Sequence, residues 1–186
     1  MKWQHNFVKT KRIQYSPFTM ILITDVHYKN DTAKVVCAVL QHWHDAVATH
    51  YWVKYVKTIA EYVPGEFYKR ELPCLLEILR DIDLQKITCI IIDGFVVLDD
   101  EGKPGLGAHL YNSLSYKVPV IGVAKTSFHQ NTNQVIPVYR GQSKNPLFIT
   151  AIGISLLKAA NHIQEMYGDY RIPAVLKEVD RRTKEE

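Results

Sequence analysis

The chain has 186 residues, of which 47% are hydrophobic and 23% are charged. This length and composition fit one domain with a single core, and they exclude a disordered protein. The formal net charge of +4 is compatible with a nucleic-acid partner but does not require one, because solvated lysine and arginine side chains cover most protein surfaces. No apolar stretch approaches the roughly 20 residues that span a bilayer, and no leader-like segment opens the sequence, so we expect a soluble, unexported protein.

The cysteines and the two ends of the chain add further limits. Cys37, Cys74 and Cys89 lie scattered in apolar segments, which argues against a disulfide framework and favours a reducing, cytoplasmic environment. Residues 1–18 form a basic N-terminal arm, with no acidic residue among the first twelve. Residues 177–186 carry charges of both signs and predict a solvated helix end that frays. The domain itself is therefore expected at residues 19–176.

Hydrophobic periodicity predicts three strands and then an alternation of helices and strands. The first strands are expected at residues 19–27, 32–41 and about 46–57, and their short connections indicate antiparallel pairing. A helix with leucines on one face comes next and leads to a strand at 87–93, which a crossover helix would make parallel. The remaining predictions are a helix near 106–115, a strand at 118–124, a short strand near 134–139 and a long helix at about 146–167.

This order resembles the ribonuclease-H-like α/β fold, a mixed sheet of three antiparallel strands followed by parallel strands and flanked by helices. The first and fourth strands are neighbours in that layout. Asp25 closes the apolar run of the first strand and Asp93 that of the fourth, so the two carboxylates are expected to meet at one edge of the sheet. Hard divalent cations prefer such oxygen ligands. For either residue alone, a role in a turn or a helix cap remains the alternative.

Two more charged residues stand where they could complete such a site. Glu71 lies in the first turn of the predicted helix and could be a metal ligand. A favourable interaction with the helix dipole would explain an acidic residue at this position equally well. Lys125 follows the buried strand at 118–124 and could support a phosphate. A lysine in this position is ordinarily only the point at which the chain returns to water.

Five collinear motifs resemble endonuclease V in order and approximate spacing. They are Tyr62-Val63-Pro64-Gly65 with Arg70-Glu71, Ile92-Asp93-Gly94, Gly105-Leu106-Gly107-Ala108-His109-Leu110, Gly122-Val123-Ala124-Lys125 and Arg171-Ile172-Pro173. The resemblance covers most of the chain, from Ile21 to Pro173. It implies a ribonuclease-H-like fold and the cleavage of DNA or RNA near a deaminated base, chiefly hypoxanthine, with Mg²⁺ or Mn²⁺ and a 3′-hydroxyl product.

The resemblance also implies roles for individual residues. The metal-binding carboxylates would be Asp25, Glu71 and Asp93, and Lys125 would support the phosphate or the transition state. Tyr62, with Pro64 and Gly65, would fill the gap that a flipped base leaves, because an aromatic ring restores part of the lost stacking. The segment Gly105, Leu106 and Gly107 would approach the flipped base with its main chain, unless it is only the loop that leads into a helix. His109 could contact nucleic acid beside it or act as a structural donor.

The sequence departs from the family pattern at several positions. The family usually carries two histidines after the Asp-Gly pair, and Phe95 and Asp99 stand in their places, which leaves Asp99 as a further candidate ligand. Residues 139–145 also lack the histidine that the family has there. We therefore keep two alternatives open: a noncatalytic nucleic-acid-binding relative, and a nuclease for branched or distorted substrates. DNA or RNA is the expected partner, and no protein partner is predicted.

Two other features of the sequence could serve the same site. His27 lies two residues beyond Asp25 on the same side of its strand, which makes it a candidate to orient a metal ligand. Tyrosine and tryptophan alternate with lysine in residues 51–57, which suggests a platform for stacked bases. Ordinary strand packing explains this alternation equally well.

Overall fold

The computed structural model describes residues 20–57, 68–128 and 130–185. The predicted basic arm and the residues of the predicted wedge, Tyr62, Pro64 and Gly65, lie outside the described residues. Within the described ranges, no helix is long and apolar enough to cross a membrane.

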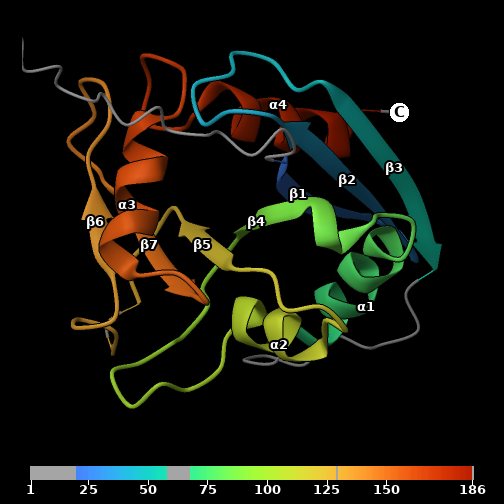
Figure 1. The fold of residues 1–186 in the computed structure, drawn as a ribbon, viewed down its shortest axis with the longest axis horizontal. Helices are drawn as coiled ribbons and strands as arrows, with labels where there is room; N and C mark the ends of the chain where they lie inside the picture. Colours follow the sequence, from blue (N-terminus) through green and yellow to red (C-terminus); the bar gives the residue numbers. More distant parts are fainter. Residues whose placement is uncertain (1–19, 58–67, 129, 186) are drawn as a thin grey trace, which may run out of the picture.

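A mixed sheet forms the centre of the molecule (Figure 1). In the described ranges it has seven strands in the order β3-β2-β1-β4-β5-β7-β6. The strands are β1 (Met20–Lys29), β2 (Thr32–Leu40), β3 (His50–Lys57), β4 (Ile87–Asp93), β5 (Val120–Ala124), β6 (Ile136–Val138) and β7 (Leu147–Ile152). β1 pairs antiparallel with β2 and β2 with β3, whereas β1–β4 and β4–β5 are parallel. The predicted meander and crossover, and with them the mixed α/β fold class, are confirmed.

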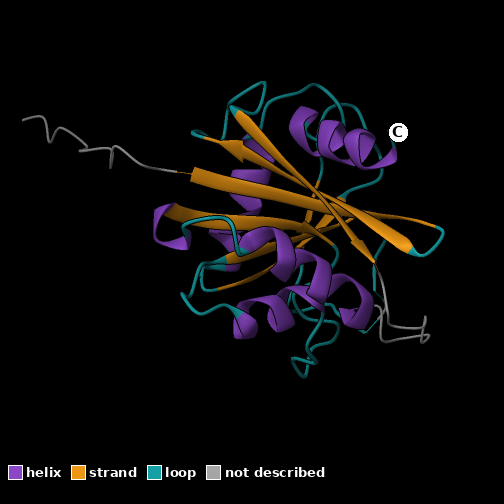
Figure 2. Cartoon of the chain, turned by 90° about the vertical axis from the view of Figure 1, so that its right-hand side faces the viewer, coloured by secondary structure: helices purple, strands orange, loops and turns teal. Residues whose placement is uncertain are grey.

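Helices cover both faces of the sheet (Figure 2). They are α1 (Tyr68–Leu79), α2 (Leu106–Ser113), α3 (Leu156–Glu165) and α4 (Ala174–Lys184), and a short 3-10 turn spans Leu84–Lys86. One core cluster joins α1 and α2 to one face of the sheet, and a second joins α3 and α4 to the other. In β1, Leu22 belongs to the first cluster and Ile23 to the second. The central strands are therefore buried on both faces, which explains their continuous apolar sequences.

The long helix predicted at residues 146–167 is wrong. The structure has strand β7 there, then a turn, and then the shorter helix α3. Gly153 in the turn has a positive φ of 77°, and the Ser155 side chain caps α3 by accepting a hydrogen bond from the Lys158 amide. A short apolar run fits a buried strand as well as a helix, so periodicity alone did not separate them. Because β7 pairs antiparallel with β5, the sheet does not end in parallel strands as predicted.

Two other boundaries also differ from the predictions. The predicted end of the domain at residue 176 falls inside α4, where Val175, Val179 and Thr183 are buried. The residues that follow it in α4 are therefore not a separate frayed tail. α4 packs against β1 and β2, so it belongs to the domain. β3 begins at His50 instead of near residue 46, since Asp45 accepts hydrogen bonds from the backbone amides of Gln41 and His42 and holds a turn.

Candidate functional site

Three neighbouring strands bring charged residues to one edge of the sheet. β1 pairs with β4 as far as Thr24 and Ile92, so Asp25 and Asp93 are the next residues on adjacent strands. Asp93 pairs in turn with Val123 of β5, two residues before Lys125. Side chains alternate between the faces of a strand, and all three charged residues fall on the face that α4 covers. The expected meeting of Asp25 with Asp93 is thereby realised, with Lys125 beside them.

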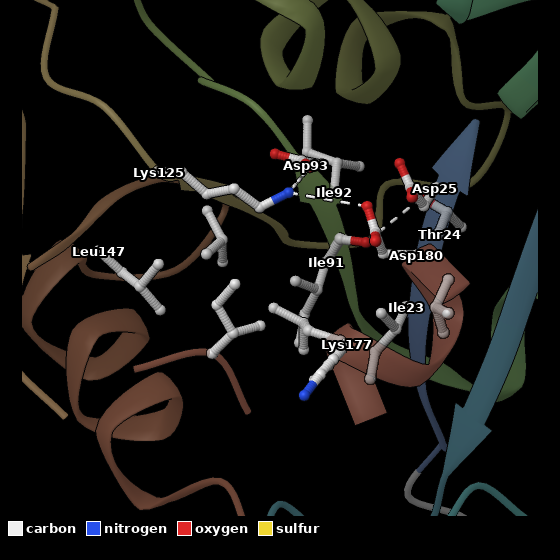
Figure 3. A pocket seen from close by; sticks show the side chains of 14 residues that line it. Ile23, Thr24, Asp25, Ile91, Ile92, Asp93, Lys125, Leu147, Lys177 and Asp180 are labelled. Carbon is white, nitrogen blue, oxygen red and sulfur yellow. Dashed lines mark hydrogen bonds and ion pairs between the residues drawn. The ribbon is translucent and has the colours of Figure 1, made fainter. Parts of the chain in front are cut away.

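Lys125 forms the central ion pair of this cluster (Figure 3). Its Nζ lies 2.7 Å from Oδ2 of Asp93 and 3.9 Å from Oδ1 of Asp180, a residue of α4. Burial opposes the charge of Lys125, yet the pKa of Lys125 is raised because Asp93 accepts its hydrogen bond and Asp93, Asp180 and Asp25 are negatively charged. The ammonium group thus stands between carboxylates from the sheet and from the helix.

Glu71 brings a further carboxylate from the opposite layer. It lies in the first turn of α1, and its side chain is only 7% exposed. Burial, with repulsion from Asp25 and Asp93, raises the pKa of Glu71 to about 9. Burial and the negative charge of Asp93 raise the pKa of Asp25 to about 6. The four carboxylates of Asp25, Glu71, Asp93 and Asp180 line one cleft of about 280 Å³, where negative charge is unfavourable unless a cation accompanies it.

Asp180 and Thr183 were missed by the sequence analysis. Thr183 Oγ1 lies 3.5 Å from Asp25 Oδ2 of β1, and both Asp180 and Thr183 lie on the α4 surface that faces the sheet. The buried positions Val175, Val179 and Thr183 are spaced by four residues, which is the signal of a helix packed on one face. The many charges around this stripe concealed it.

The acidic side chains of the cleft are of the chemical type that a divalent cation prefers, but they are not gathered around one point. Carboxylate oxygens are the preferred ligands of Mg²⁺, and burial, together with the nearby negative charges, raises the pKa values of Asp25 and Glu71. Within the described ranges, however, no three His, Cys, Asp or Glu side chains lie close enough together to hold a metal ion. Lys125 supplies the positive charge between Asp93 and Asp180 instead.

The Arg171-Ile172-Pro173 motif contacts the backbone around Lys125 and the first residues of α4. The Arg171 guanidinium donates hydrogen bonds to the backbone carbonyls of Lys125 and of Pro146, the latter at 2.7 Å. Pro173 occupies the N-cap position of α4, the helix that carries Asp180. The motif therefore fixes the backbone of Lys125 and the start of the helix that faces it.

The structure gives the glycine-rich segment a packing role. A Cβ on Gly105 would lie 2.5 Å from the carbonyl oxygen of Phe95, and one on Gly107 would lie 2.6 Å from a methyl group of Val96. Leu106 is buried in the core, and the ring of His109 stacks on Tyr68 at 3.7 Å between centroids. Contact between Gly105, Leu106, Gly107 or His109 and a flipped base stays a prediction.

The positions where the family usually has histidines are occupied differently. The ring of Phe95 contacts that of Phe128 edge to face, with centroids 6.1 Å apart. Asp99 does not join the cluster, because its carboxylate accepts a hydrogen bond from the Lys103 amide at 2.7 Å and it does not line the carboxylate cleft. His27 does line that cleft.

A mixed sheet with helices on both faces and carboxylates gathered at one edge defines a ribonuclease-H-like α/β protein. The endonuclease V family model matches residues 2–181, and the chain belongs to the endonuclease V family. The match extends almost to the end of α4 and includes Asp180.

Solved structures of endonuclease V proteins share this fold. The catalytic domain of human endonuclease V superposes with a TM-score of 0.69 at 22% identity, over 91% of this chain and 82% of that one. Endonuclease V from Streptomyces avermitilis gives 0.69 at 23% identity, over 90% and 81%. Endonuclease V from Ciona intestinalis, in complex with DNA containing an inosine followed by a ribo-adenosine, gives 0.71 at 18% identity, over 89% and 84%.

Proposed function

We propose that this protein is a Mg²⁺- or Mn²⁺-dependent endonuclease that cleaves a phosphodiester bond near a deaminated base in DNA or RNA. The observation that carries the proposal is the meeting of Asp25, Asp93 and Lys125 with Asp180 at one sheet edge. The preference for hypoxanthine rests on the family and on the inosine-containing DNA bound to the Ciona protein.

Asp25, Glu71, Asp93 and Asp180 would hold the divalent cation. When bound, such an ion activates a water molecule and offsets charge on the leaving oxygen. Deprotonated carboxylates are needed for this, and the raised pKa values of Asp25 and Glu71 mean that cation binding competes with protons. An ion held by Asp93 would also compete with the Lys125 ammonium for the same oxygens.

Lys125 would place a fixed positive charge beside the phosphate on which negative charge develops. Arg171 holds the backbone of Lys125 through its carbonyl, so the side chain projects from an anchored point. A preorganised charge of this kind stabilises a transition state without rearranging during the reaction. Tyr62, Pro64 and Gly65 would wedge the base stack, and the Gly105–Gly107 backbone with His109 would contact the extruded base, as the family motif implies.

The proposal is tested with labelled strands that contain one inosine and with matched undamaged strands. Each is incubated with Mg²⁺, with Mn²⁺ and with chelator, for the wild-type protein and for Asp93→Asn. Metal-dependent nicking near inosine that is lost in Asp93→Asn supports the proposal. Nicking that persists in chelator or in Asp93→Asn contradicts it.

A noncatalytic nucleic-acid-binding protein is the second candidate, and two observations favour it. Phe95 packs on Phe128 where the family usually has a histidine, and Lys125 already pairs with Asp93. The same assay separates the two candidates. Inosine strands that bind but are not cut with either metal would support this second function.

A further inference from the structure

A second groove opens directly beside the carboxylate cleft. It has a volume of about 260 Å³ and is lined on one side by β1, β2 and β3 and on the other by the C-terminal end of α4. In Figure 1 this end of α4 lies near β2 and β3. His27, Thr183 and Lys184 line both the groove and the carboxylate cleft, so the two are continuous.

The floor of the groove is a row of side chains across three strands. His27 of β1 pairs with Lys34 of β2, and Lys34 pairs with Tyr55 of β3. His27 is two residues beyond Asp25 and therefore on the same face of β1. With strand spacings of about 4.8 Å and rises of about 3.4 Å per residue, the Cα atoms of Asp25 and Tyr55 are about 12 Å apart. The row thus leads away from the proposed cleavage point.

The groove is predominantly cationic. Lys29, Lys34 and Lys184 line it with one acidic residue, Glu185. The Lys184 ammonium is paired with Asp180 of the carboxylate cleft, so Lys34 is the cation on which this surface depends. Lys34 Nζ donates a hydrogen bond to the neutral backbone carbonyl of Glu185 at 2.8 Å, so its charge is not cancelled there. The Glu185 carboxylate pairs with Arg181, outside the groove. A chain of phosphates is the complementary ligand for such a surface.

Tyr55 adds an aromatic face to these charges. Its side chain is 65% exposed, and Lys34 Nζ lies 5.9 Å from the centroid of its ring. Exposed rings beside lysines along a groove are the usual platform for the bases of a single strand, because stacking accepts every base and lysine attracts the backbone. Of the aromatic residues in β3, Tyr55 is the exposed one, whereas Tyr51 and Trp52 pack against the core clusters.

We propose that this groove, named here the β3 groove, is a subsite that holds the nucleic-acid strand on one side of the cleaved bond. A base a few nucleotides from the cleaved phosphate stacks on Tyr55, and an intervening phosphate lies beside Lys34. The inference rests on the proposed nucleic-acid substrate but does not require that cleavage occurs. It extends the substrate contacts beyond the deaminated base and its immediate neighbours.

The test is a binding measurement on the full chain in the Asp93→Asn background, so that no strand is cut. Fluorescence anisotropy is recorded in Mg²⁺ with labelled, inosine-containing single strands of about 20 nucleotides, as DNA and as RNA. We expect Tyr55→Ala to weaken binding about 5-fold to 100-fold, the effect of losing one base stack, and Tyr55→Phe to restore it. Lys34→Ala is expected to reduce the slope of log affinity against log salt concentration by about 0.7.

A matched control comes from the opposite edge of the sheet. Tyr116 is also exposed and lies before β5, far from the end that carries Lys125, so Tyr116→Ala should leave affinity unchanged. When the nucleic-acid strand is shortened on the side that the β3 groove holds, the difference in affinity between Tyr55→Ala and its parent should disappear.

The outcomes separate this inference from the proposed function. The subsite is overturned if Tyr55→Ala binds as tightly as the Asp93→Asn parent, or if Tyr116→Ala loses as much affinity as Tyr55→Ala. It is also overturned if the parent protein binds none of the nucleic-acid strands. Tyr55-dependent binding supports the subsite even when the wild-type protein fails to nick inosine strands, a failure that would overturn only the endonuclease proposal.

Discussion

Lys125 Nζ lies 2.7 Å from Asp93 Oδ2, and the two residues stand at the ends of adjacent parallel strands. Both side chains are somewhat more than two-fifths exposed, so their ion pair contributes at most about 1 kcal/mol to folding. The pair instead sets the charge of the site, because it places the ammonium group among carboxylates that repel one another. Its importance should therefore be visible in activity and not in stability.

Replacing Lys125 separates these two effects. We expect Lys125→Ala to reduce metal-dependent nicking about 10²-fold to 10³-fold, the usual effect of removing one preorganised electrostatic group. The free energy of unfolding should change by no more than about 1 kcal/mol. Nicking rates under single-turnover conditions and urea titrations provide the two measurements. Lys158→Ala, at an exposed position of α3, is the charge-matched control. Full activity in Lys125→Ala would refute the role of Lys125.

Asp180 is predicted to be a metal ligand although it comes from the last helix. Asp180→Asn should lower the affinity for Mn²⁺ at least about tenfold, since even residues that only orient ligands have effects of that size. Isothermal titration calorimetry with Mn²⁺ measures this directly, without reference to activity. Asp81→Asn removes the same charge from a carboxylate that pairs with Lys54 away from the cleft, and should bind as wild type does. If Asp180→Asn and Asp81→Asn bound Mn²⁺ with equal affinity, Asp180 would not be a metal ligand.

Glu71 and Asp25 make stability depend on pH. Their folded-state pKa values of about 9 and about 6 exceed the ordinary values of 4.5 and 3.8. At pH values between the ordinary and the raised pKa, the folded protein therefore binds more protons than the unfolded chain. The free energy of unfolding, measured in chelator, should therefore fall as pH rises from about 4 to about 9. Glu71→Gln removes the larger part of this dependence and should be more stable than wild type, by on the order of 1–3 kcal/mol at pH 7.

Urea titrations at a series of pH values check this expectation. Glu165→Gln changes an exposed acid at the end of α3 and should leave the pH profile as it is. Mg²⁺ should stabilise wild type more than Glu71→Gln, because an ion that binds only the folded state raises the free energy of unfolding. Identical pH profiles for wild type and Glu71→Gln would show that Glu71 is not an ionisable member of the cluster.

Gly122 is expected to be intolerant of any side chain. A Cβ at this position in β5 would lie 2.5 Å from the carbonyl oxygen of Gly94 and 2.7 Å from Thr150 Oγ1. That hydroxyl accepts a hydrogen bond from the Val96 amide at 2.8 Å, and the intrusion would separate the two. Gly122→Ala should therefore reduce the free energy of unfolding by about 1–3 kcal/mol in a urea titration. Unchanged stability would mean that the loop after β4 yields without cost.

Much of the fold was accessible from local patterns. The apolar runs that became β1, β4 and β5 are rich in β-branched residues and are each followed by a charged residue, so their burial and the positions of Asp25, Asp93 and Lys125 followed directly. β7 was mistaken for part of a helix, because its short apolar run fits a strand and a segment of a buried helix equally and further apolar residues follow it. The turn at Gly153 and the cap at Ser155 were the available signals.

The sequence by itself determined the alternation of elements, the family motifs and the acids that close the apolar runs of the central strands, because these depend on neighbours along the chain. Only the tertiary structure decided that α4 belongs to the site, where Asp180 approaches Lys125 and Thr183 approaches Asp25. A helix rich in charges of both signs looks solvated in sequence. Which of its faces is covered depends on a sheet built from residues more than a hundred positions earlier, such as Asp25 beneath Thr183, and local composition carries no information about that contact.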